Sequence, residues 1–142
     1  MIEVHLDSIP DYLKKSKLYS ELKEHDDKEN DLISIPDNVL FNRQINSIID
    51  LEDFLETCRF WCLDDIPFYF YDFILENKDL IDDNLNEIKE RFFDYFIIID
   101  IQILTKYQQF NICSKASLNG RLNLLKYGHN KNFYWNLFTC AY

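Results

Sequence analysis

The pattern of apolar and polar positions predicts two short strands in the first third of the chain. Residues 2–6 (IEVHL) alternate between apolar and polar side chains, as in a half-buried strand. A second run, LISI at 32–35, stops at Pro36, a common turn signal, and residues 36–49 show no clear pattern. The acidic stretch 24–31 (EHDDKEND) lies between the two strands, and its dense charge indicates a solvated loop.

Two short helices are predicted between these strands. Ser8 is a candidate N-cap, and Pro10 would lie in the first turn of a helix over about 9–15. Ser16 can cap a second short helix that runs up to the acidic loop, since its side-chain oxygen can accept a backbone N–H of the first turn.

A longer helix is predicted over about 51–62 (LEDFLETCRFWC). Its apolar side chains recur every three or four residues, at Leu51, Phe54, Leu55, Cys58 and Trp61. Asp50 is a candidate N-cap, Asp64-Asp65 mark the end, and Pro67 can open the next element.

The stretch from Phe60 to Phe73 is unusually aromatic. It contains Phe60, Trp61, Phe68, Tyr69, Phe70, Tyr71 and Phe73. One helix or strand cannot bury all seven against a single side. Two interpretations stay open: a core that packs on this stretch from both sides, or an interface, internal or with a partner, that takes part of the set.

Helices are predicted for most of the second half. Asp82-Asp83 would start a helix over about 84–99, whose apolar stripe includes Phe92, Phe93 and Phe96. Asp100 could cap a further helix over about 101–110.

The last quarter of the chain shows one more turn and helix. Residues 112–118 can continue helical, and Asn119-Gly120 predicts a turn. A helix over 121–127 (RLNLLKY) would then stop at Gly128. After a loop at 129–136, a further element is expected to begin near Trp135.

The composition is that of a folded domain without a membrane segment. Of 142 residues, 47% are hydrophobic and 16% aromatic, which excludes disorder for most of the chain and suffices for a core. No apolar run approaches the roughly 18–20 residues that span a bilayer, so no membrane association is expected. The first residues show no signal-peptide pattern, and we expect a cytoplasmic location.

The charge is strongly asymmetric along the chain. The net charge of −10 argues against nonspecific nucleic-acid binding, which needs clustered Lys and Arg. All 25 acidic residues lie in residues 1–100, whereas residues 101–142 hold five basic residues and no acidic one. This asymmetry suggests two structural units, or one unit with opposed faces.

Nothing in the sequence indicates a catalytic, cofactor or metal site. The four cysteines, Cys58, Cys62, Cys113 and Cys140, lack the spacing and histidine partners of a zinc site, and we expect buried free thiols. The tight acid pairs at 64–65 and 82–83 are expected at helix starts, where the helix dipole explains them. We therefore expect no enzyme and no cofactor.

Four segments of the chain together resemble BTB/POZ domains, especially their Skp1/elongin-C branch. They are residues 9–39, 51–62, 64–75 and 92–104. The elements follow one another in a similar order. Residues 9–39 would hold two short helices bearing a serine, an acidic loop and a strand ending in Pro, and residues 51–62 a helix. An "IP…F" element follows at 64–75 (DDIPFYFYDFIL) and a helix pair at 92–104 (FFDYFIIIDIQIL). The family's first strand is missing. Its absence favours a monomer or a heteromer over the strand-exchanged BTB homodimer, although a homodimer stays open.

A second resemblance covers the C-terminal residues. The run KASLNGRLNLLKYGHNKNFYWNLFTCAY (115–142) resembles ankyrin-like repeats, in particular those of giant DNA viruses of protists. Thr139-Cys140-Ala141-Tyr142 would open a following repeat. Together the resemblances imply an α+β, mainly helical fold, with a BTB/POZ-like domain at 1–110, including a small sheet, and a partial ankyrin-like repeat at 111–142.

The resemblances also imply a function. A viral adaptor without enzymatic activity would bind a cullin scaffold, and so a ubiquitin ligase, in the host cytoplasm and present a target protein to it. The expected partner-binding residues are Phe60, Trp61, Phe68, Phe70, Asp94, Tyr95 and Phe96. The alternative is a self-associating structural protein whose aromatic stretch pairs with copies of the chain.

Overall fold

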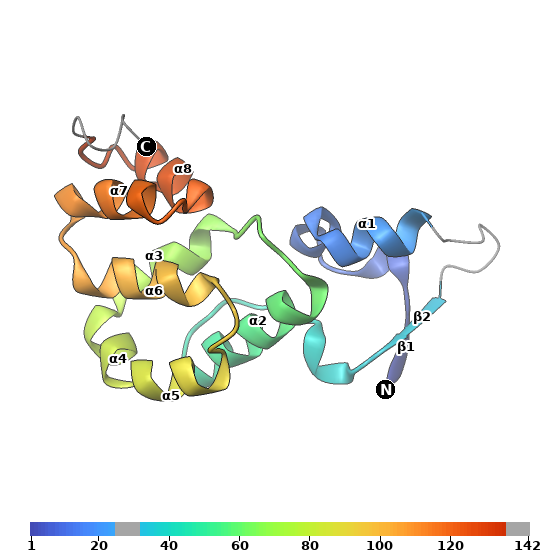
Figure 1. Ribbon diagram of the computed structural model, residues 1–142. Coiled ribbons are helices and arrows are strands. Elements are labelled where there is room, and N and C mark those ends of the chain that lie inside the picture. The colour runs from blue at the N-terminus through green and yellow to red at the C-terminus, as the bar shows by residue number, and fades with distance from the viewer. Residues whose placement is uncertain (25–31, 136–142) are drawn as a thin grey trace. The chain divides into compact units, whose positions relative to one another are not determined.

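The chain folds into two compact units, Met1–Ile66 and Pro67–Tyr142. The computed structural model describes residues 1–24 and 32–135, and these are mainly helical with one small antiparallel sheet (Figure 1). The expected mainly helical α+β class is thereby confirmed. The boundary that the resemblances place at 110/111 falls inside the second unit, and that two-domain assignment stays a prediction.

The two predicted strands pair with each other in the first unit. β1 (Ile2–His5) runs antiparallel to β2 (Leu32–Ile35), and Ile2 lies opposite Ile35. The sheet has only these two strands among the described residues. The predicted acidic loop falls almost wholly outside the described residues, as does the start of a second repeat at 139–142.

The first unit contains five helical elements among its described residues. They are η1 (Leu6–Ser8), η2 (Asp11–Lys15), α1 (Lys17–Glu24), η3 (Asp37–Val39) and α2 (Ile48–Trp61).

The serine caps predicted near the N-terminus have different outcomes. Ser16 does cap α1, because its Oγ accepts the N–H of Tyr19 at 3.1 Å. The cap predicted at Ser8 is wrong, since Ser8 ends η1 and its hydroxyl donates to the carbonyl of His5.

The helix α2 forms as its apolar spacing predicts, but Ser47, not Asp50, is its N-cap. The Oγ of Ser47 accepts the backbone N–H of Asp50. The Asp50 carboxylate turns back instead and accepts the N–H of Asn46 at 3.0 Å and the guanidinium of Arg43 at 2.9 Å. The Asn46 hydrogen bond and Arg43 lower the pKa of Asp50 below its usual value.

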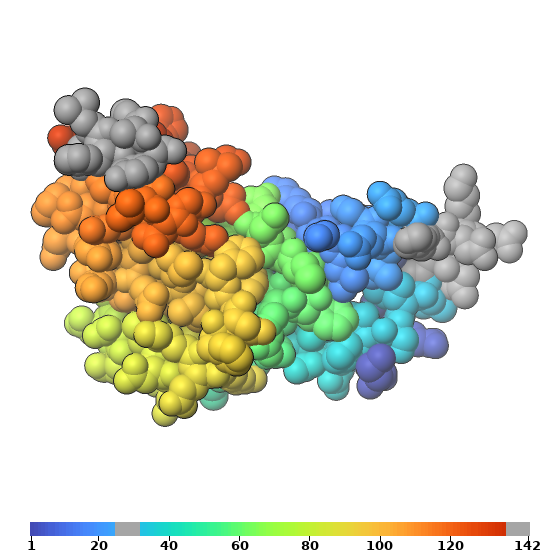
Figure 2. All heavy atoms as spheres, viewed as in Figure 1, coloured from blue at the N-terminus to red at the C-terminus, as the bar shows by residue number. Residues whose placement is uncertain are grey.

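Six helices build the described part of the second unit. They are α3 (Phe68–Glu76), α4 (Lys78–Asp83), α5 (Leu85–Arg91), α6 (Ile97–Lys106), α7 (Gln109–Leu118) and α8 (Leu122–Asn130). α6 is central because it packs against α3, α4 and α7. Figure 2 shows the side chains of this unit packed in sequence order: the yellow residues of α4 and α5, then those of α6, then the orange and red residues of α7 and α8.

The long helix predicted over 84–99 is wrong. Asp82 and Asp83 end α4 rather than starting a helix, and the chain leaves the helical path at 92–96 before α6 begins at Ile97. Asp100 is also not a cap, because it lies inside α6 with a fully buried side chain. Asp100 can be buried inside the helix because it has a partner far away in the sequence. Arg121, in the turn between α7 and α8, donates hydrogen bonds to its carboxylate.

Gly128 lies inside α8 and does not end it, contrary to the prediction. The helix passes so close to α7 that a Cβ on Gly128 would lie 2.5 Å from the Sγ of Cys113 and 3.4 Å from the ring of Phe133. The glycine is therefore required by packing between the two helices and not by a change in backbone direction.

Replacing Gly128 by alanine is expected to lower the free energy of unfolding by about 1–3 kcal/mol, because the added methyl overpacks a buried contact. Urea denaturation followed by circular dichroism measures the loss. Cys113→Ala in the same chain should recover part of it by removing the obstructing sulfur. A single Gly128→Ala variant that gains stability, as helix propensity alone would predict, would contradict this account.

Candidate functional site

The seven residues expected to bind a partner are divided between the two units. Phe60 and Trp61 lie near the end of α2, Phe68 and Phe70 lie in α3, and Asp94, Tyr95 and Phe96 lie in the turn between α5 and α6. Phe68, Phe70 and these three turn residues belong to the second unit, whereas Phe60 and Trp61 belong to the first.

Three of the seven belong to the core and leave no face for a partner. Trp61 and Phe70 are fully buried, and Tyr95 is nearly so. The indole Nε1 of Trp61 donates a hydrogen bond of 2.8 Å to the carbonyl of Val39, which fixes the ring against η3. The prediction that these three side chains contact a partner directly is wrong, because they are buried in the core.

Phe60 and Phe68 are partly exposed and rest on buried aromatic neighbours. Phe60 is half-buried and meets Trp61 edge-on at a centroid distance of 5.8 Å. Phe68 meets Tyr127 edge-on at 5.3 Å and keeps 36% of its surface exposed. The aromatic stretch 60–73 therefore serves mainly as core, with a minority of its rings at the surface.

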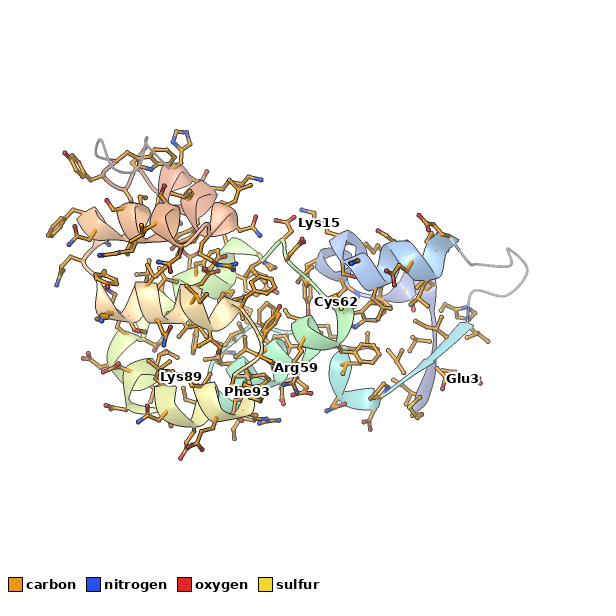
Figure 3. All side chains as sticks on the ribbon, in the orientation of Figure 1. Glu3, Lys15, Arg59, Cys62, Lys89 and Phe93 are labelled. Carbon is orange, nitrogen blue, oxygen red and sulfur yellow. The ribbon has the colours of Figure 1, made fainter. Side chains whose placement is uncertain are left out.

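The turn between α5 and α6 alternates inward and outward aromatic side chains. Phe92 and Tyr95 point into the unit, whereas Phe93 is 82% exposed and Phe96 is 43% exposed. The N–H of Tyr95 donates to the carbonyl of Phe92 at 2.9 Å, and this hydrogen bond closes the turn. Figure 3 labels Phe93 beside the end of α5. We name residues 92–96 the aromatic turn.

The aromatic turn is fixed from behind by a buried charge pair. The guanidinium of Arg121 lies 4.6 Å from the centre of the Phe96 ring. Its Nε and Nη2 donate to the two oxygens of Asp100 at 2.6 and 2.9 Å, the bidentate geometry that suits a carboxylate. The hydroxyl of Tyr71 donates a third hydrogen bond, 2.9 Å long, to Asp100. The ring of Phe96 thus lies on a guanidinium that is itself held by a fully buried carboxylate.

Asp100, Arg121 and Tyr71 form a polar cluster in which the negative and the positive charge are paired. Burial alone would lower the pKa of Arg121, but the hydrogen bonds and charge of Asp100 raise it above its usual value. The pKa of Tyr71 is raised far above its usual range, mainly by burial and secondly by the charge of Asp100, so its hydroxyl remains a donor. Both shifts keep Arg121 charged and Tyr71 protonated, so both side chains remain hydrogen-bond donors to Asp100.

A second polar contact ties α8 to α3. The hydroxyl of Tyr127 donates a 2.6 Å hydrogen bond to Asp72, and the ammonium of Lys131 lies 3.4 Å from the same carboxylate. Burial and Asp72 raise the pKa of Tyr127. With the Asp100–Arg121 pair, this contact connects the α7–α8 hairpin to the rest of the second unit at two separate points.

Within the described residues, the potential metal ligands are not gathered into a site. Across residues 1–24 and 32–135, no three His, Cys, Asp or Glu side chains are placed to hold a metal ion. Cys58 and Cys113 are buried as expected, and burial raises the pKa of both thiols. Cys62 is exposed, contrary to the expectation, and Cys140 lies outside the described residues.

Phe93 is the most exposed ring of the aromatic turn, and the sequence interpretation missed it. The apolar spacing predicts that Phe92 and Phe93 both lie on the inner stripe of a long helix, with both rings toward the core. Two adjacent aromatic residues cannot both lie at the centre of one apolar face, and that fact was the available signal.

No helix among the residues that the structure describes has the length and apolarity needed to cross a bilayer. No family model, no curated protein and no solved structure matches the chain.

Proposed function

We propose that this chain is a protein-interaction module without enzymatic activity, and that the aromatic turn is its contact with a partner protein. The observation that carries the proposal is the exposure of Phe93, 82%, on a turn closed by buried Phe92 and Tyr95. An exposed ring on a fixed backbone loses little conformational entropy on binding, so it can contribute much of its buried area to affinity.

The proposed partner is a cullin-type scaffold, with a target protein bound elsewhere on the chain. The resemblance of residues 92–104 to the closing helices of Skp1-like proteins suggests this partner, because those helices contribute to the scaffold contact in that family. The exposed rings of Phe93 and Phe96, with the carboxylate of Asp94 between them, give the turn the apolar and charged character that such a contact needs. Viral origin and host cytoplasm belong to the same proposal.

Removing the Phe93 ring is expected to weaken partner binding strongly. In light scattering of the full chain mixed with cullin N-terminal domains, the wild type should form a one-to-one complex. Phe93→Ala should weaken it by about 2 kcal/mol, or roughly 30-fold in Kd. Phe110→Ala is the matched control, because Phe110 is a second exposed phenylalanine of the same unit and is 57% exposed.

The two other outcomes have distinct meanings. A wild-type chain that forms a stable dimer sensitive to Phe93→Ala, and that binds no cullin domain, would support self-association through the same turn. Equal binding by wild type, Phe93→Ala and Phe110→Ala would overturn the role of the turn itself.

A further inference from the structure

A groove of about 560 Å³ lies along α6 in the second unit, separate from the aromatic turn. Leu85, Ile99 and Ile103 give it aliphatic walls, and the amides of Gln102 and Asn119 also line it. In Figure 1, α6 lies between α4 on one side and α7 on the other. The lining residues come from α4, α5 and α6 and from the positions that directly follow α6 and α7. Its lining thus combines apolar contact area with groups that can donate and accept hydrogen bonds.

Three lysine side chains contact Tyr107, which lines the same groove. Of the three, Lys106 is itself a lining residue, whereas Lys78 and Lys115 reach Tyr107 from outside the lining. The ammonium of Lys78 donates a 3.1 Å hydrogen bond to the Tyr107 carbonyl. The ammonium groups of Lys106 and Lys115 lie 5.6 and 5.1 Å from the centre of its ring. In the described part of the chain, none of the three lies within 4.0 Å of a carboxylate. Like charges gathered in this way repel each other, and a bound anion would relieve that repulsion.

We propose that this groove binds an acidic peptide segment of a partner protein. One or more carboxylates of the segment would lie at the Tyr107 end between Lys106 and Lys115. A neighbouring aliphatic side chain of the segment would pack on Leu85 and Ile99, which are the partly exposed aliphatic residues of the lining. The Gln102 and Asn119 amides would pair with its backbone, as polar groups at the edge of peptide-binding grooves do.

The lining favours a peptide over other anions. A nucleic acid would need a track of cations and stacking rings, but this groove has one aromatic ring, aliphatic walls and a carboxylate, Asp82, among its lining residues. A small inorganic anion would make no use of the aliphatic walls. Charge complementarity and apolar contact are both satisfied only by a chain that carries carboxylates and aliphatic groups at close spacing.

This inference is independent of the proposed role of the aromatic turn. The two surfaces involve different side chains, so a variant can remove one and keep the other. An adaptor needs two such surfaces, and the groove would supply the second, for a partner of defined chemistry.

The test is to select ligands for the full-length chain from a phage library of random peptides of about twelve residues. The selected peptides should be enriched in Asp and Glu beside Leu, Ile or Val. A selected peptide is then labelled and its Kd measured by fluorescence anisotropy. Lys106→Glu with Lys115→Glu should weaken it at least about tenfold, and Asp82→Asn should strengthen it by removing a like charge.

Matched variants separate the possible outcomes. Lys126→Glu reverses an exposed lysine of α8 outside the groove and should change the Kd by less than about twofold. Phe93→Ala should leave peptide binding intact, so failure of the aromatic turn and failure of the groove can be told apart. The proposal is overturned if no peptide is selected, if selected peptides lack acidic enrichment, if Lys126→Glu acts as strongly as the groove variant, or if a single-stranded oligonucleotide displaces the peptide at equal concentration.

Discussion

Replacing Arg121 by methionine is expected to lower the free energy of unfolding of the second unit by about 3–5 kcal/mol. Asp100 is fully buried and receives two of its three hydrogen bonds from this guanidinium, at 2.6 and 2.9 Å. Without them, the hydroxyl of Tyr71 is the one partner that the carboxylate keeps among the described residues, and none of these residues supplies an opposite charge. Urea denaturation followed by circular dichroism measures the loss.

A matched variant in the first unit isolates the effect of burial. Arg43 makes the same kinds of contact as Arg121: it donates to a carboxylate, Asp50, through Nε and Nη2, and it lies over a phenylalanine ring, Phe41, at 4.7 Å. Its side chain is 56% exposed, whereas that of Arg121 is 13% exposed. Arg43→Met should therefore cost far less, because water can replace the lost partner.

Removing both charges should restore most of the stability. Asp100→Leu combined with Arg121→Met leaves no unpaired buried charge, so the double variant should be more stable than Arg121→Met alone. If Arg121→Met and Arg43→Met cost the same, the pair would not be the structural link that its burial indicates.

Local signals in the sequence were sufficient for some elements. The strands predicted at 2–6 and 32–35 and the helix predicted over about 51–62 form as β1, β2 and α2, with shifted ends for β1 and α2. Alternation, apolar spacing and the Pro36 turn signal are each contained within a few neighbouring residues. Ser16 was identified as a cap for the same reason. These elements depend on their own residues more than on distant contacts.

The missed features depend on residues far apart in the chain. Between Phe92 and Leu104 nearly every position is apolar, so helical spacing could not show where one helix ends and the next begins. Asp100 resembled a cap because its partner, Arg121, lies 21 residues further on. Gly128 resembled a helix stop because Cys113, which requires a glycine there, lies in the preceding helix.

The sequence predicts the proposed contact turn at 94–96, but it does not show which of the aromatic rings there face outward. The sequence interpretation chose 94–96 as the contact turn, and the structure does place a surface turn there. It assigned Tyr95 to the surface and Phe93 to the core, and the structure reverses both assignments. The inward and outward sides of a turn depend on its closure, here the hydrogen bond from Tyr95 N–H to the Phe92 carbonyl, which no apolar spacing encodes.

Trp61→Ala is expected to lower the free energy of unfolding of the first unit by about 3–5 kcal/mol, because it removes a fully buried ring and leaves a cavity. It also removes the donor of the 2.8 Å hydrogen bond to the Val39 carbonyl, which joins α2 to η3. Trp61→Phe should cost less, about 1–3 kcal/mol, since it keeps most of the ring and loses the hydrogen bond. Urea denaturation followed by circular dichroism measures both losses.

The same variants decide between a core role and a contact role for Trp61. If Trp61 were a contact residue, Trp61→Ala would weaken partner binding and leave stability unchanged. As a core residue, it should reduce stability while a properly folded fraction still binds as the wild type does. Ile49→Ala is the control on the same helix, because Ile49 is 71% exposed and should change stability by less than about 0.5 kcal/mol. In either Trp61 variant Trp135 is the only tryptophan left, so its fluorescence reports on the second unit alone and shows whether the loss is confined to the first.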